Sequence, residues 1–211
     1  MLIVITPEHD VKDETKIIND FFELNLEALH LRKPFYTINE YEAYLADIKK
    51  EYHHKIVLHE AHELCEVYEL KGVHLQEQFR KDLKNDLKDY VSKFKSCKRK
   101  RFSVSSSFHD KESINKCNVV FDYYLLSPVF NAISKKGYKG KGFDVNDIQA
   151  TIIGMGGVTT ETMKTIFDLG FKGAGVLGSV WNVESPTTAF KQLKTHHDNY
   201  IIFIIKSGRC H

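Results

Sequence analysis

The sequence contains few cysteines, which form disulfides and metal sites, and few prolines, which interrupt helices and strands. Its 211 residues include four cysteines and four prolines, and the cysteines are scattered without a Cys-x-x-Cys pair. This pattern argues against a zinc site and against a disulfide scaffold. It is typical of proteins in a reducing compartment, so we expect a cytoplasmic protein.

Charge of one sign and long apolar runs are also scarce. The 30 lysines and arginines nearly balance the 28 aspartates and glutamates, which gives a formal net charge of +2. This balance gives no reason to expect a nucleic acid or an anionic membrane surface as a partner. The apolar run at residues 201–205 is far too short to span a bilayer.

The sequence does contain a regular alternation of apolar runs and amphipathic stretches, which is typical of repeated β-α units. The apolar runs predict eight strands, at residues 2–6, 28–32, 56–59, 72–75, 102–106, 123–127, 151–155 and 173–177. The amphipathic stretches predict helices at residues 14–23, 39–52, 63–70, 83–94, 111–116, 144–149, 160–168 and 187–195. These units predict a single-domain α/β protein, a (β/α)8 TIM barrel over residues 1–197, with residues 198–211 as a tail outside the barrel repeat.

Two glycine-rich segments near the end of this pattern point to a ligand. Gly154-Met155-Gly156-Gly157-Val158 ends the seventh predicted strand, and residues 173–179 form and follow the eighth. In an eight-fold barrel, the turns after these strands gather backbone N–H groups and helix N-termini around a phosphate. Glycine suits such turns because it allows a positive φ and a close approach to an anion. The sequence therefore predicts a phosphorylated small molecule as ligand.

A cation and a basic loop stand at two other predicted strand ends. Arg32 ends the second strand, where its guanidinium could bind phosphate through two parallel hydrogen bonds or could pair with a nearby glutamate. Residues 131–142 follow the sixth strand and contain three glycines and four lysines. They predict either a solvated loop or a lid over an anionic substrate. Within this loop, Ser134 and Lys135 could contact phosphate oxygens.

Three histidines lie in or near the ends of predicted strands. His59 begins the segment His59-Glu60-Ala61-His62, but the second histidine is at i+3 rather than i+4, so no zinc motif is indicated. His59 could act as a lone acid or base at the end of the third strand, because imidazole titrates near neutral pH. His30 and His74 could point toward the barrel mouth or toward the helices. As hydrogen-bonded core residues they would need no function.

Together these segments resemble the thiamine phosphate synthase superfamily, which includes the TenI-like thiazole tautomerases. The resemblance runs from Leu29 to about Trp181, and its motifs occur in the family's order. These motifs are His30-Leu-Arg-Lys33, Lys55-Ile-Val-Leu-His59, Gly72-Val-His-Leu75, Ser103-Val-Ser105, the segment from Asp122 to Phe130 with Ser134-Lys135, Gly156-Gly-Val158, and the segment from Gly173 to Ser179.

The resemblance implies thiamine biosynthesis on small phosphorylated substrates. The family's default activity is condensation of hydroxymethylpyrimidine diphosphate with thiazole phosphate, in which Mg²⁺ neutralises the departing diphosphate. By resemblance, thiazole phosphate would meet the backbone N–H groups of Gly156, Gly157, Leu177 and Gly178. The pyrimidine diphosphate would face Arg32, Ser105, Ser134 and Lys135. Family members often pair, so a homodimer is a further expectation.

Departures from the family pattern leave the reaction open. Synthases place an Asn-Asp pair at the end of the third strand, where this chain has Leu58-His59. They place a second aspartate after the fourth strand, where this chain reads Gln76-Glu77-Gln78. Glu77 is the candidate metal ligand at that position, and Glu60 or Glu63 could also hold magnesium in a variant site. The histidine that tautomerases use near the end of the sixth strand falls at Pro128.

Three functions therefore remain. Arg32, His59 and Lys135 are the candidate catalytic residues, and a synthase would use Mg²⁺ as cofactor. In a TenI-like tautomerase, proton transfer through His59 would need no metal. In a catalytically silent barrel, the site would bind a phosphate ligand and do no chemistry.

Overall fold

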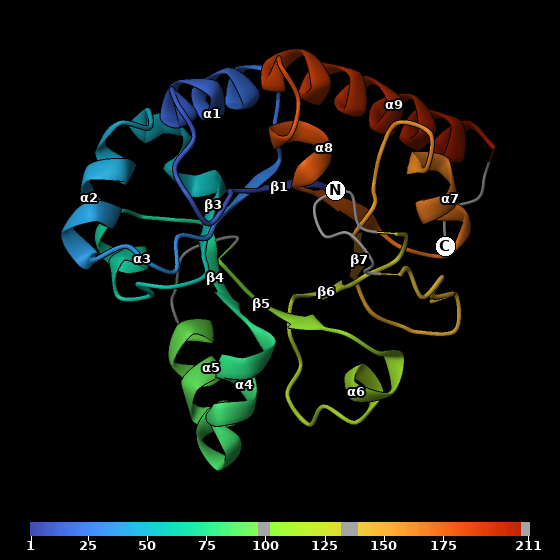
Figure 1. The fold of residues 1–211 in the computed structure, drawn as a ribbon. Coiled ribbons are helices and arrows are strands. Elements are labelled where there is room, and N and C mark those ends of the chain that lie inside the picture. The colour runs from blue at the N-terminus through green and yellow to red at the C-terminus, as the bar shows by residue number, and fades with distance from the viewer. Residues whose placement is uncertain (97–101, 132–138, 208–211) are drawn as a thin grey trace.

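The computed structural model describes residues 1–96, 102–131 and 139–207. Eight parallel strands follow one another around a closed barrel, and β8 pairs with β1 to close it (Figure 1). The strands are β1 (Leu2–Ile5), β2 (Ala28–Leu31), β3 (Ile56–Leu58), β4 (Gly72–Leu75), β5 (Ser103–Phe108), β6 (Tyr123–Leu126), β7 (Ile152–Met155) and β8 (Gly173–Val176). All eight predicted strands are present with ends within two residues of the prediction, and the TIM-barrel fold is confirmed.

Helices surround the barrel on its outer face (Figure 1). They are α1 (Glu14–Glu23), α2 (Ile38–Ala46), α3 (Leu64–Val67), α4 (Glu77–Asp82), α5 (Leu87–Lys95), α6 (Lys111–Asn115), α7 (Met163–Asp168), α8 (Gly178–Trp181) and α9 (Pro186–Lys206), with 3-10 turns η1 (Lys50–Lys55) and η2 (Lys84–Asp86). Local sequence sets several of their starts. Thr37 and Glu40 form a reciprocal capping box at α2, and Pro186 stands in the first turn of α9.

Several helix predictions are corrected. Helix α2 ends at Ala46 instead of 52, α3 spans only Leu64–Val67, and α5 begins at Leu87 instead of 83. Residues 144–149 contain a turn at 146–147 and no helix. The Asp144 carboxylate accepts from the Asn146 backbone N–H and competes with helical hydrogen bonding. Helix α4 is present where no helix was predicted. The last helix does not end at 195 but continues through residues 198–206, where Ile202 and Phe203 are about half exposed. Among the described helices, none combines the length and apolar character needed to cross a bilayer.

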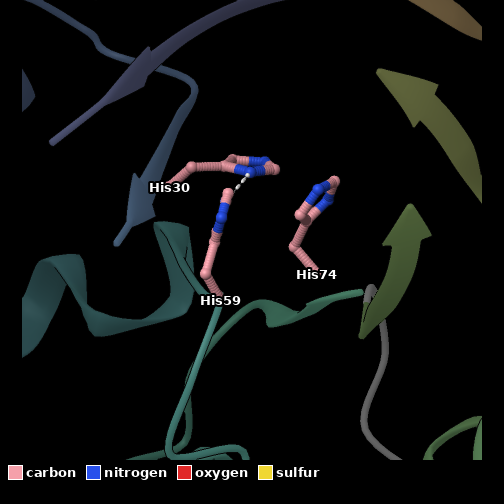
Figure 2. Close-up of side chains that lie close together, drawn as sticks. All are labelled: His30, His59 and His74. Carbon is pink, nitrogen blue, oxygen red and sulfur yellow. Dashed lines mark hydrogen bonds between the residues drawn. The ribbon is translucent and has the colours of Figure 1, made fainter. Parts of the chain in front are cut away.

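The interior of the barrel has an apolar half and a polar half. Alternate residues of each strand face inward. On one side they form a separate small apolar cluster, made of Ile3, Ile5, Ala28, Tyr123, Leu125 and Ile153. On the side of β2 to β5 the interior instead contains histidines and serines. Figure 2 shows His30, His59 and His74 pointing toward one another there.

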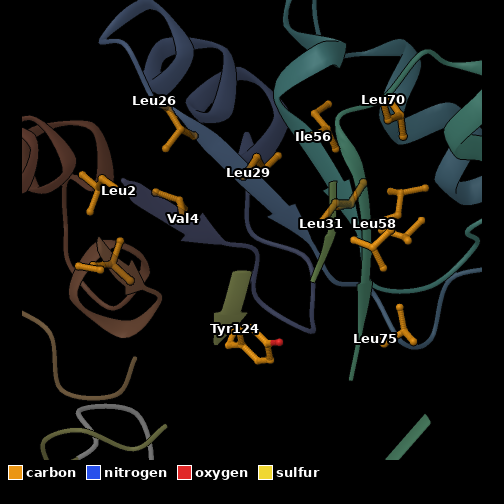
Figure 3. Packing of buried hydrophobic residues seen from close by; sticks show 14 of the residues in the cluster. Leu2, Val4, Leu26, Leu29, Leu31, Ile56, Leu58, Leu70, Leu75 and Tyr124 are labelled. Atoms are coloured by element: carbon orange, nitrogen blue, oxygen red, sulfur yellow. The ribbon is translucent and has the colours of Figure 1, made fainter. Parts of the chain in front are cut away.

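The main apolar core lies between the barrel wall and the helices. Outward-facing strand residues such as Val4, Leu29 and Leu58 are fully buried against this layer (Figure 3). Burying a side chain of this kind contributes roughly 1.5–3 kcal/mol, so the stability of the fold rests mainly on this outer layer. The polar half of the interior is therefore free to carry a site.

Candidate functional site

The candidate site lies at the carboxyl ends of the strands, where TIM barrels carry their active sites. Arg32 directly follows β2, and its backbone is held by Thr6, whose hydroxyl accepts from the Arg32 N–H (2.8 Å) and donates to the Arg32 carbonyl (3.1 Å). The guanidinium forms an ion pair with Glu8 at 2.6 Å, and 29% of the arginine side chain is exposed. The pairing with a glutamate that the sequence suggested is thus present. It uses only the Nη1 nitrogen of Arg32, so the other N–H groups of the guanidinium can donate to an anion.

The next residue, Lys33, points to the other side of the strand end. Its side chain is fully buried, and its ammonium lies 2.8 Å from Glu14 and donates to the His9 carbonyl at 3.1 Å. Lys33 therefore serves the packing of α1.

His59 is not a lone residue, because it belongs to a buried cluster with His30 and His74. His30 Nδ1 lies 2.9 Å from His59 Nε2, and His30 Nε2 lies 2.7 Å from the Tyr123 hydroxyl. The His59 and His74 rings stack at 4.3 Å between centroids. His59 Nδ1 is buried and has no hydrogen-bond partner among the described residues.

Burial keeps these imidazoles neutral. It lowers the pKa of His30 to about 3, with a smaller effect from Lys71. Burial, followed by the charges of the neighbouring histidines, also holds the pKa values of His59 and His74 well below the ordinary value. At neutral pH the three rings therefore carry lone pairs that can accept a proton, a hydrogen bond or a metal ion.

Serines on β5 hold His74. Its Nδ1 lies 2.8 Å from the Ser105 hydroxyl, and its Nε2 lies 2.7 Å from the Ser107 hydroxyl. Ser105 is fully buried, so in this conformation it contacts His74 rather than the open mouth. Ser134 and Lys135, predicted to contact phosphate, lie outside the described residues.

The glycine turn after β7 adopts the conformation that its sequence suggested. Gly156 and Gly157 both have positive φ, of 89° and 67°. A Cβ at Gly157 would lie 2.3 Å from the Asn131 carbonyl oxygen, and one at Gly156 would lie 3.0 Å from Pro128. Side chains are therefore excluded at both positions, and the backbone of the turn is bare.

The turn after β8 lies beside it, because β7 and β8 are paired up to Met155 and Gly175. Leu177 precedes α8, which begins at Gly178, so the first N–H groups of this short helix have no partner within the helix. The Ser179 hydroxyl in its first turn is buried and has no hydrogen-bond partner among the described residues. Both turns thus present polar groups at the same end of the barrel.

Magnesium, which the resemblance implies, does not fit the carboxylates at this end of the barrel. The Glu77 carboxylate is surrounded by Lys81 (3.3 Å), Arg80 (3.6 Å) and His109 (3.7 Å). Glu60 accepts from the Tyr41 hydroxyl at 2.7 Å. Mg²⁺ prefers oxygen ligands, whereas strand β3 is followed by the imidazole of His59. We therefore assign no step to magnesium.

His109 is a site candidate that the sequence did not single out. It follows β5, its Nδ1 lies 2.9 Å from the Ser127 carbonyl, and its side chain is 43% exposed. Ser127 directly precedes Pro128, where tautomerases are expected to carry their histidine. The structure thus brings an imidazole from a neighbouring strand end close to that position.

Comparison with known proteins bears on this geometry. Residues 2–180 match the model of a family described as thiamine monophosphate synthase. The structure of a thiamine phosphate pyrophosphorylase from Bacteroides thetaiotaomicron is 29% identical, with 93% of this chain and 97% of that chain covered and a TM-score of 0.71. One from Pyrococcus furiosus, at 16% identity with 94% and 95% covered and a TM-score of 0.72, shows the shared fold. No curated protein matches the sequence.

Proposed function

Because the chain belongs to the thiamine monophosphate synthase family, we propose that it condenses hydroxymethylpyrimidine diphosphate with thiazole phosphate to form thiamine phosphate and diphosphate. The observation that carries this proposal is the pair of bare turns after β7 and β8, with Gly156 and Gly157 at positive φ. These turns offer backbone donors without side chains in the way, which suits a phosphate monoester.

Thiazole phosphate would bind with its phosphate in this cradle. Its partners would be the N–H groups of Gly156, Gly157, Leu177 and Gly178. The Ser179 hydroxyl, which is buried and unpartnered among the described residues, would add a donor. This arrangement holds the thiazole ring over the barrel mouth with its nitrogen available for attack.

The second substrate would bind on the opposite side of the mouth. In the reaction, the bond between the pyrimidine methylene carbon and the diphosphate oxygen breaks, and a bond from that carbon to the thiazole nitrogen forms. No proton needs to move, so catalysis consists of holding the two substrates in line and stabilising the departing diphosphate. We assign the diphosphate to Arg32, and by resemblance to Ser134 and Lys135. Ser105 would act through His74.

One observation favours tautomerisation as a second candidate function. His59 Nδ1 is buried without a partner among the described residues, and its Nε2 continues through His30 to the Tyr123 hydroxyl. A neutral imidazole of this kind can take a proton from one substrate atom and return it to another, which leaves the buried cluster neutral before and after the reaction. A tautomerase would use this property on a carbon acid of the thiazole.

The two functions, and a silent binding protein, are separated by one set of measurements. The purified protein is mixed with both substrates, and thiamine phosphate and diphosphate are quantified. In parallel, thiazole phosphate is titrated by calorimetry, and the thiazole tautomers are followed by NMR in deuterated water. Equal formation of both products supports the synthase. Deuterium incorporation without condensation supports the tautomerase, and binding without either reaction supports a silent barrel.

A further inference from the structure

We propose that His30, His59 and His74 form a binding site for a divalent transition-metal ion, with zinc as its representative. One ring nitrogen from each histidine lies within 4.8 Å of the other two. His30 and His74 are fully buried, and His59 is 8% exposed. Figure 2 shows the three side chains converging from β2, β4 and the residue after β3. The proposal is independent of which reaction the protein catalyses.

The distances are close to those of a three-histidine site. Imidazole nitrogens bind zinc at roughly 2.0–2.1 Å, so two of them on a tetrahedral ion lie about 3.3 Å apart. His30 Nδ1 and His59 Nε2 are 2.9 Å apart and need to separate only slightly. His74 must move toward them, which opens its stack on His59. Metal binding thus replaces the His30–His59 hydrogen bond, one hydrogen bond between His74 and a serine, and one ring stack with three metal bonds.

The surroundings orient the rings in the way that metal sites require. Ligating histidines usually bond their second nitrogen to a fixed polar group. His30 does so through Nε2 to the Tyr123 hydroxyl. His74 has Ser105 on one nitrogen and Ser107 on the other, so one serine remains when the other nitrogen turns to the metal.

A second observation points to a ligand at the same place. His59 Nδ1 is buried and has no hydrogen-bond partner among the described residues. Buried polar atoms are nearly always paired, so one without a partner indicates a group that the protein alone does not supply. A metal ion bound at Nδ1 supplies that partner, whereas one bound at Nε2 takes the place of the hydrogen bond to His30.

The donor set selects the class of metal. Three neutral imidazoles suit zinc, iron, cobalt, nickel or copper, and they do not suit magnesium or calcium, which prefer oxygen. The three histidines supply no negative charge, so the ion keeps its double positive charge and an open coordination position. The charge and the open position both favour an additional ligand with an anionic oxygen atom. A phosphate or diphosphate oxygen has this chemistry.

The test is direct metal binding by the full chain, without any activity readout. Metal-free protein is titrated with Zn²⁺ against a chromogenic chelator. Co²⁺ is then added, and its visible absorption is recorded. We expect roughly one tightly bound ion per chain and a Co²⁺ spectrum typical of four or five ligands with nitrogen donors. Zinc should also raise the melting temperature, because it binds the folded chain.

Variants identify the ligands. His59→Gln should weaken zinc binding at least about 100-fold, and Tyr123→Phe, which removes only the hydroxyl on His30, should weaken it roughly 10–100-fold. His53→Gln is the matched control, because His53 is also buried but contacts the Leu45 and Ile48 carbonyls away from the cluster. Its zinc affinity should be unchanged.

Two results would overturn the proposal. One is wild-type protein that binds no zinc ion tightly. The other is zinc binding that His59→Gln and Tyr123→Phe leave intact. If His59→Gln fails to fold, NMR of the imidazole nitrogens in the wild-type protein tests whether the three histidines bind zinc. Zinc must then shift the nitrogens of all three rings, and an unchanged spectrum shows that the cluster is only hydrogen-bonded.

Discussion

Replacing Gly157 by alanine tests whether the turn after β7 must be bare. Gly157 has a φ of 67°, and an added Cβ would meet the Asn131 carbonyl oxygen at 2.3 Å. Gly142 provides the matched control, because it has a φ of 55° and an added Cβ there would meet nothing within 4 Å. The two substitutions share the backbone cost of alanine in the left-handed region and differ in the steric clash.

The expected magnitudes follow from that difference. Gly142→Ala should lower the free energy of unfolding by about 1 kcal/mol, the cost of the left-handed conformation. Gly157→Ala should lose this and roughly 1–3 kcal/mol more, because backbone must move to admit the methyl group. For a chain of this size, each kcal/mol lowers the melting temperature by roughly 2–4 °C. The displaced turn should also bind thiazole phosphate at least about 10-fold more weakly, which corresponds to the loss of one hydrogen bond to a charged group.

Calorimetric unfolding and calorimetric titration with thiazole phosphate provide the assay. We expect Gly142→Ala to bind like the wild type and Gly157→Ala to bind weakly or not at all. Equal losses of stability in the two variants would refute the steric argument. A Gly157→Ala protein with wild-type affinity would refute the assignment of the phosphate to this turn.

Three further predictions concern ionisable side chains. Arg32→Ala should reduce use of the pyrimidine diphosphate far more than binding of thiazole phosphate, whereas the control variant Glu8→Gln should still bind both substrates. Steady-state kinetics and calorimetry with each substrate measure the two effects. Equal losses for both substrates would contradict the assignment of Arg32 to the diphosphate. Lys33→Met should destabilise the fold by about 3–5 kcal/mol in denaturant unfolding, because it leaves the buried Glu14 carboxylate unpaired, and an unchanged midpoint would contradict this. In metal-free protein, lowering the pH from about 7.5 to about 5.5 should reduce the free energy of unfolding by about 1.4 kcal/mol through His30 alone. The folded pKa of about 3 lies below the unfolded value, so the unfolded chain binds the proton in this range. A free energy of unfolding, measured in urea, that rose on acidification would contradict this prediction.

The fold was predictable because most strands are short apolar runs between turn signals. Strand β5, with the sequence Ser-Val-Ser-Ser-Ser-Phe, is an exception. The same reasoning placed Arg32 and the glycine turns at strand ends. It failed at residues 144–149, where the Asp144 side chain bonds the local backbone, and at α4, whose sequence Glu-Gln-Phe-Arg-Lys-Asp has little apolar periodicity. Local polar interactions and packing determine the secondary structure of both segments, and the pattern of apolar residues does not reveal these interactions.

The histidine cluster was not predicted because its members are far apart in the sequence and only the closed barrel brings them together. A signal was nevertheless present. His30 lies two residues before Arg32, and residues two apart on a strand face the same side. If Arg32 faces the mouth, His30 must face the interior below it. The same parity places His74 below Gln76. Which histidines meet, however, depends on the order of the strands around the barrel, and the alternation of side chains along one strand does not give that order.

The central claim is that the chain joins two phosphorylated substrates at the mouth of the barrel. The most direct measurement is a single-turnover reaction, with protein in excess over hydroxymethylpyrimidine diphosphate and thiazole phosphate, quenched and analysed by mass spectrometry. The account predicts thiamine phosphate in an amount equal to the diphosphate released, and its loss in Arg32→Ala. Intact substrates after prolonged incubation, with thiazole phosphate bound to the protein, would contradict it.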